Sequence, residues 1–129
     1  MSHPVLNESP LNVFVIIATT TEHWRNPHSE EGKVVLLEHY AWGKELKESG
    51  KLLLAGPSDV ELTTTGLIDA VGHITGIIML KANTREEAEA IAFNDPFHKH
   101  QYRVNKVQSL KITMTNDSIY SQLEKTINA

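Results

Sequence analysis

The sequence contains no cysteine among its 129 residues. This absence excludes disulfides, thiolate nucleophiles and cysteine-based zinc or iron–sulfur sites. Long apolar runs are also missing, since the longest, Val13 to Ala18, is far too short to span a bilayer. The first ten residues show neither a basic start nor an apolar signal core. We therefore expect a cytoplasmic protein that has no membrane partner.

The chain also lacks a concentration of positive charge. Its formal net charge is −4, and its acidic and basic residues are interspersed. Nucleic-acid binding is not expected, because no basic stripe could neutralise phosphates. No GxGxxG segment, GK[ST] loop or nucleophile elbow occurs. Nicotinamide, nucleotide triphosphate and serine-hydrolase chemistries are thus poorly supported, and no cofactor is predicted.

The length indicates one domain with a single hydrophobic core. We expect residues 1–10 to form a flexible arm and residues 11–129 to form that domain. Apolar patterns predict strands over 11–18, 51–55, 74–80 and 104–114. Helices are predicted over 32–49, from the capping box at 84–87 to the stop before Pro96, and over 117–127. The connection 19–32 is long enough to be a functional loop, and 58–73 is predicted to be a loop or hairpin crossing.

The predicted order of elements is β-α-β-β-α-β followed by a terminal helix. This order is typical of the α+β, ferredoxin-like fold, a four-stranded antiparallel sheet with two helices on one face. The other face of the sheet would then have no helix over it. Because the strands are too apolar to leave that face in water, we expect a homodimer in which a second copy covers it.

His39 is the first candidate for chemistry. On a helical wheel it falls in line with Val35, Trp42 and Leu46, on the apolar face of the predicted helix. Partial desolvation favours a neutral imidazole, and such an imidazole, held by a partner, is a competent general base near pH 7. The alternative is a core histidine satisfied by one hydrogen bond, which the pattern taken alone favours.

Two further segments could complete a site. Asp95 precedes Pro96, where an acid usually makes a local turn contact. It could instead accept a hydrogen bond from one imidazole nitrogen and leave the other free to take a proton. The strand end at Gly56, Pro57 and Ser58 could bring backbone N–H groups to a developing oxyanion, although the pattern taken alone favours a plain turn.

Two pairs of histidines raise the question of a metal. His23 and His28 form one pair, and His98 and His100 form the other. Neither pair has the i, i+4 spacing of a zinc-binding helix, and no cluster of carboxylates or thiolates accompanies them. We therefore expect no bound metal.

Taken together, the motifs resemble the YCII-related family. The resemblance rests on helical His39, on the segment 48–57 (ESGKLLLAGP), on Glu86-Glu-Ala88 and on Asn94-Asp95-Pro96-Phe97, and it spans roughly residues 11–114. It implies a ferredoxin-like fold that dimerises through its sheets into an α+β barrel. It also implies a His39–Asp95 dyad in a pocket. The family's characterised activity, a dehydrochlorinase acting on a chlorinated hydroxyquinol, uses no cofactor.

These observations favour a cofactor-independent lyase or isomerase, similar to a dehydrochlorinase, acting on a small oxygenated substrate. His39 would abstract a proton and Asp95 would orient it. The backbone of Gly56, Pro57 and Ser58 would stabilise negative charge, and Trp42 and Phe97 would supply an apolar lining. A non-catalytic module that binds or senses a small metabolite is the alternative, and a purely structural dimeric domain is the third.

Overall fold

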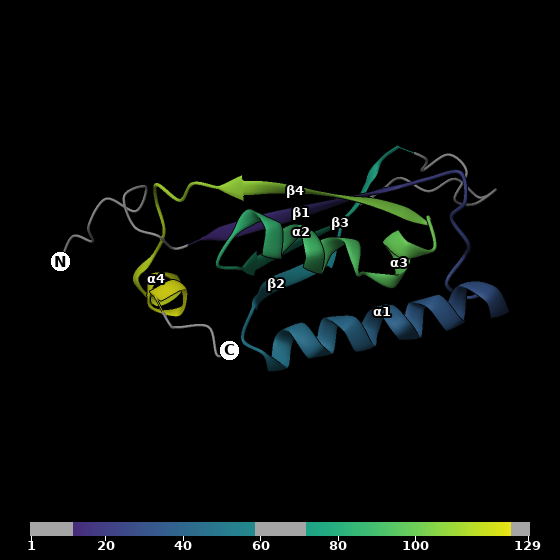
Figure 1. Cartoon of the computed structure of the whole chain (residues 1–129), viewed down its shortest axis with the longest axis horizontal. Coiled ribbons are helices and arrows are strands. Elements are labelled where there is room, and N and C mark those ends of the chain that lie inside the picture. Colours follow the sequence, from purple (N-terminus) through teal and green to yellow (C-terminus); the bar gives the residue numbers. More distant parts are fainter. Residues whose placement is uncertain (1–11, 59–71, 125–129) are drawn as a thin grey trace.

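The computed structural model describes residues 12–58 and 72–124. Its elements are β1 (Val13–Thr20), α1 (Glu30–Glu48), β2 (Leu52–Pro57), β3 (Ile74–Lys81), α2 (Arg85–Phe93), α3 (Pro96–Lys99), β4 (Arg103–Leu110) and α4 (Asp117–Glu124). The strands form one antiparallel sheet in the order β2-β3-β1-β4, and α1 runs along it (Figure 1). The predicted α+β fold with a terminal helix is confirmed. The predicted arm 1–10, most of 58–73 and the last residues of the predicted helix 117–127 lie outside the described residues.

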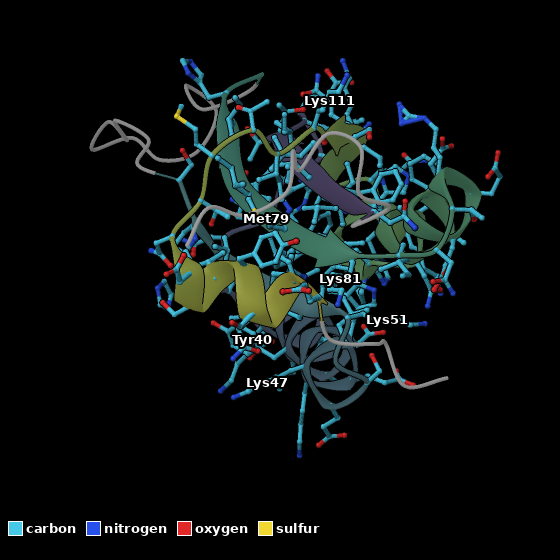
Figure 2. All side chains as sticks on the ribbon, turned by 90° about the vertical axis from the view of Figure 1, so that its left-hand side faces the viewer. Tyr40, Lys47, Lys51, Met79, Lys81 and Lys111 are labelled. Carbon is cyan, nitrogen blue, oxygen red and sulfur yellow. The ribbon has the colours of Figure 1, made fainter. Side chains whose placement is uncertain are left out.

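Both long helices cover the same face of the sheet. Trp42 and Leu46 of α1 and the small residues of α2 pack on one core, whose buried members are Phe14, Ile16, Trp42, Leu46, Ile78, Leu80, Ala82, Ala88 and Ala92. Side chains alternate between the two faces of a strand, and the members two residues apart, Phe14 and Ile16 of β1 and Ile78 and Leu80 of β3, point to this core. Figure 2 shows α1 end-on, on one side of the strands.

The opposite face of the sheet carries the alternate residues of the same strands. Val15 and Ile17 of β1 are half-buried there, while Ile77 of β3 and Val104 of β4 are each 39% exposed. Ile17 pairs directly with Ile77 across the sheet. Apolar side chains therefore continue across three strands on a face that the chain itself leaves partly open to solvent.

Local chemistry sets the helix ends. The Ser29 hydroxyl accepts a hydrogen bond from the Gly32 N–H at 3.0 Å and caps the helix. The helix α1 therefore begins at Glu30, two residues before the predicted start at Gly32. The predicted end at residue 49 agrees with the structure to within one residue, and Gly50 follows the cap with a φ of +77°. The Thr84 hydroxyl accepts from the Glu87 N–H at 3.0 Å, as the capping box predicted.

Several predicted boundaries were wrong. β2 continues through Gly56 and Pro57 instead of ending before them, which an edge strand tolerates because a proline there leaves no ladder bond unmade. The predicted stop before Pro96 is confirmed, since α2 ends at Phe93, but the short helix α3 that Pro96 begins was not predicted. β4 ends at Leu110 and not at Met114, whose side chain is 88% exposed. Among the described helices, none has the length and apolar character needed to cross a membrane.

Gly32→Ala should destabilise the protein. A Cβ at this position would lie 2.0 Å from the Asn26 carbonyl oxygen, so the backbone before α1 must shift. We expect the free energy of unfolding, measured with urea, to fall by about 1–3 kcal/mol. Gly43→Ala on the same helix is the matched control, because its Cβ would meet nothing within 4 Å. It should raise stability by up to about 1 kcal/mol through helix propensity. Equal stability of Gly32→Ala and the unmodified protein would contradict this account.

Candidate functional site

His39 and Asp95 meet although they are far apart in the sequence. His39 projects from the middle of α1, and Asp95 is the residue that caps α3. The imidazole Nδ1 lies 2.7 Å from Oδ1 of Asp95. The same oxygen accepts from the Phe97 N–H at 3.1 Å. Both sequence-based interpretations of Asp95 are therefore correct, because one carboxylate oxygen makes the turn contact and holds the histidine.

The second oxygen of Asp95 is held from β4. Oδ2 accepts from Arg103 Nη2 at 3.1 Å and from Asn105 Nδ2 at 2.9 Å. Asn105 Nδ2 also donates to the Ala92 carbonyl oxygen at 2.8 Å, which ties the cluster to α2. Asp95 is fully buried. A carboxylate in this position is tolerated because four donors from three segments satisfy it.

The charge on Asp95 follows from these contacts. Burial raises the pKa of this carboxyl, but the hydrogen bond and charge of His39, the hydrogen bond of Asn105 and the charge of Arg103 outweigh it, and the pKa lies below its usual value of 3.8. Burial also lowers the pKa of Arg103, with Asp95 acting in the opposite direction. At neutral pH the pair is a carboxylate and a guanidinium.

An ionised carboxylate can only accept hydrogen bonds, so it determines the tautomer of His39. When the ring is neutral, Nδ1 carries the proton and donates a hydrogen bond to Asp95, and Nε2 keeps its lone pair. When the ring is protonated, its charge contributes to the lowered pKa of Asp95. The ring stacks on Phe97 with the centroids 4.4 Å apart, and Trp42 lies 5.4 Å away. Trp42 Nε1 donates to the Ile91 carbonyl oxygen at 3.1 Å. The imidazole is therefore held in one orientation by an acceptor and two aromatic rings.

A cavity of about 980 Å³ adjoins the histidine. Its walls come mainly from α1 and from the β2 and β3 strands. His39 lines it together with every residue that the sequence suggested for substrate binding, namely Trp42, Gly56, Pro57, Ser58 and Phe97. Asp95 is not part of the lining and lies behind His39. The volume is at the upper end of the usual range for small-molecule sites.

One expected role does not fit the geometry. The Ser58 N–H donates to the Thr75 carbonyl oxygen at 3.0 Å, as part of the pairing of β2 with β3. Pro57 has no N–H. These two residues line the cavity, but neither has a free amide N–H with which to bind the expected oxyanion. The strand continues past the point where a turn was expected, and its pairing uses the donor.

The sequence did not lead us to predict Arg103 and Asn105 as site residues, although Arg103 lines the cavity and both donate hydrogen bonds to Asp95. A pattern in the sequence could have pointed to them. In β4 these two polar residues alternate with Val104 and Lys106, so they share one face of the strand. Polar residues that alternate at the start of a strand packed under a helix indicate a buried polar network.

The paired histidines have other roles. His98 Nδ1 accepts from the Asn105 N–H at 3.1 Å, and His98 stacks on Phe93. His100 Nε2 lies 3.8 Å from a Glu38 carboxylate oxygen. Within residues 12–58 and 72–124, no group of three histidine, aspartate or glutamate side chains could hold a metal ion.

Asp95→Asn should lower the free energy of unfolding at pH 7 by about 3–5 kcal/mol, because it leaves Arg103 buried without its counter-charge. The depressed pKa of Asp95 gives stability that is complete above the usual value of 3.8 and is lost as the pH falls through the lower folded value. Urea unfolding between pH 7 and pH 3 should therefore show the two proteins converging in acid.

Glu48→Gln is the control for this measurement. Its carboxylate is 68% exposed and lies 4.0 Å from Lys44, so the change should stay within about 0.5 kcal/mol at every pH. Stability of Asp95→Asn equal to that of the unmodified protein at pH 7 would refute the ion-pair argument.

Comparison with known proteins places this arrangement in a family. Among solved structures, the chain is similar to the 5-chloro-2-hydroxyhydroquinone dehydrochlorinase from Burkholderia phenoliruptrix AC1100, in complex with 2,5-dihydroxybenzoquinone. The TM-score is 0.53 at 22% identity, over 77% of this chain and 93% of that one, which shows a shared fold. No match was found among curated proteins. The family model of the YCII-related domain matches residues 13–110, and the chain therefore belongs to the YCII-related domain family.

Proposed function

We propose that this protein is a cofactor-independent lyase or isomerase that removes a proton from a small oxygenated substrate. The observation that carries the proposal is the 2.7 Å contact between His39 Nδ1 and the buried carboxylate of Asp95, with the imidazole lining a cavity. The similar dehydrochlorinase holds a small dihydroxyquinone, which supports a planar oxygenated ligand.

The chemistry follows from the tautomer. Nε2 of His39 makes no hydrogen bond to the described part of the chain. It takes a proton from a substrate C–H or O–H, and the electron pair of that bond stays on the substrate as an enolate. In a lyase, this pair then forms a double bond while a leaving group departs with its own bonding pair. In an isomerase, the imidazolium returns the proton to a different carbon.

The cavity suits such a substrate. Trp42 and Phe97 are aromatic members of the lining and lie next to the base. A flat ring can pack against such an apolar wall with little loss of rotational freedom. Asp95 is held by three donors besides His39 and is buried, so it orients the base without reaching the substrate.

We also propose that a second copy covers the apolar face of the sheet. Val15, Ile17, Ile77 and Val104 continue across three strands there, and a patch of this kind is typically buried by association. A two-fold arrangement of two sheets face to face would bury it and leave the helices and the cavity on the outside.

Substitution of His39 tests the catalytic proposal. A panel of small cyclic enols, lactones and halogenated hydroquinones in D₂O is followed by NMR for deuterium uptake and product. His39→Ala should lower the rate on any active compound by about 10²-fold or more, the usual contribution of a general base. His100→Ala is the matched control, since this histidine lies on the surface beside Glu38. It should retain the rate.

The result also separates the two candidate functions. An undiminished rate in His39→Ala would exclude His39 as the base. A compound that binds in the cavity of the unmodified protein, with neither exchange nor product for any member of the panel, would instead identify a binding or sensor module. In that case His39→Ala would weaken affinity without altering a product.

Ile77→Lys tests the dimer. A lysine in the middle of the proposed interface would bury an unpaired charge, so the variant should be monomeric at concentrations where the unmodified protein is dimeric. Light scattering coupled to size-exclusion chromatography measures this directly. Leu37→Lys is the control, because Leu37 is 58% exposed on α1 and lies outside this face. A dimer that survives Ile77→Lys would place the interface elsewhere.

A further inference from the structure

Arg103 has hydrogen-bonding capacity that the fold does not use. Its side chain is 8% exposed, and Nη2 donates to Asp95. Nε is buried without a partner in the described structure. Nη1 makes no hydrogen bond to the described residues either, but unlike Nε it is reached by solvent. A guanidinium held by one edge thus has a free donor at a residue that lines the cavity.

The free donor sits where a glycine makes room for it. Nη1 lies 3.0 Å from the place that a Cβ of Gly76 would occupy, and Gly76 lines the same cavity. Cζ of Arg103 is 4.6 Å from the centroid of the Phe97 ring, on which His39 also stacks. Arg103 and His39 therefore contact the same aromatic ring, and each binds one of the two oxygens of the Asp95 carboxylate. Their relative position is determined by the fold.

The charges around the cavity have one sign. Its charged lining residues are Lys44, Lys47 and Arg103, and no aspartate or glutamate is among the lining residues of the described structure. Lys44 lies 4.0 Å from Glu48 and Arg103 is paired with Asp95, so neighbouring carboxylates offset part of the charge of these two side chains. In a chain of net charge −4, the described lining itself still carries positive side chains and no negative ones. Such a wall raises the local concentration of anions.

We infer that Arg103 binds an anionic oxygen of the substrate through Nη1, so that the cavity selects small planar anions over neutral molecules of the same shape. The anionic oxygen is a carboxylate, an enolate or a phenolate. The planar fork of arginine suits this task, because it can hold Asp95 on one edge and a ligand on the other. This inference rests on the same cavity as the proposed function. In that reaction Arg103 would supply the charge stabilisation that the amides of Pro57 and Ser58 cannot provide.

Binding of unreactive pairs of probes tests the inference apart from catalysis. Benzoate is compared with benzamide, and 4-nitrophenolate with 4-nitroanisole, by NMR titration of the full chain. The unmodified protein should bind at least one anion about tenfold or more tightly than its neutral counterpart. The first pair reports a carboxylate preference and the second a phenolate or enolate preference. His39→Ala should retain the preference, so a failure of the proposed reaction leaves this test intact.

Arg103→Gln should abolish the preference for the anion, while affinity for the neutral probe stays within about threefold. Lys33→Gln carries the same change of net charge on an exposed part of α1 outside the lining, and it should retain the preference. Gly76→Ala crowds Nη1 without removing the charge, and it should weaken anion binding alone. This second variant decides the matter if Arg103→Gln does not fold.

Three outcomes would overturn the inference. One is equal binding of anions and neutral probes by the unmodified protein. Another is a preference that survives Arg103→Gln, or Gly76→Ala where the first variant does not fold. The third is a preference lost equally in Lys47→Gln, because the general field of the cavity wall would then account for it without a contact to Arg103.

Discussion

The buried carboxylate of Asp95 joins the parts of this fold that carry its chemistry. It caps α3, holds His39 of α1 and binds Arg103 and Asn105 of β4. Removing such a charge from water costs several kcal/mol, and the attraction to its partners offsets this only when the geometry is good and every lone pair is used. The contacts of Asp95 are therefore expected to form together, because a partly formed cluster would leave a buried charge without enough partners. When the cluster forms, α1, α3 and β4 take the relative positions that place His39 in the wall of the cavity.

The sequence predicted the four strands and the longer helices because these depend on local patterns, whereas the pairing of His39 with Asp95 came from the resemblance to a family. His39 interrupts an apolar helical stripe, and Asp95 precedes a proline, so both stand out in one dimension. Arg103 does not stand out in this way. Its position becomes informative only once the faces of β4 are known, and the predicted strand over 104–114 began after Arg103. The structure ends the strand at Leu110, and its buried polar residues lie at the beginning.

The oxyanion role of the β2 end could not be judged from sequence for a related reason. Whether a backbone amide is available depends on the partner strand, which is distant in the sequence. Ser58 pairs with Thr75, so its donor is occupied. A glycine-proline pair usually indicates a turn with exposed amides, yet here it continues an edge strand. Gly56, Pro57 and Ser58 line the cavity, but neither Pro57 nor Ser58 has a free amide for the role expected of them.

The charges of His39, Asp95 and Arg103 explain how a buried cluster can be stable and still suit the proposed proton transfer. With His39 neutral, Asp95 and Arg103 cancel, and the buried group has no net charge. In the proposed reaction, proton transfer creates an imidazolium beside Asp95 and a negative charge on the substrate. Each new charge then has a counter-charge already in place: the carboxylate for the imidazolium, and Arg103 for the substrate oxygen. Because the fold holds both partners before the reaction, little reorganisation accompanies the transfer, and preorganisation of this kind is the main source of electrostatic catalysis.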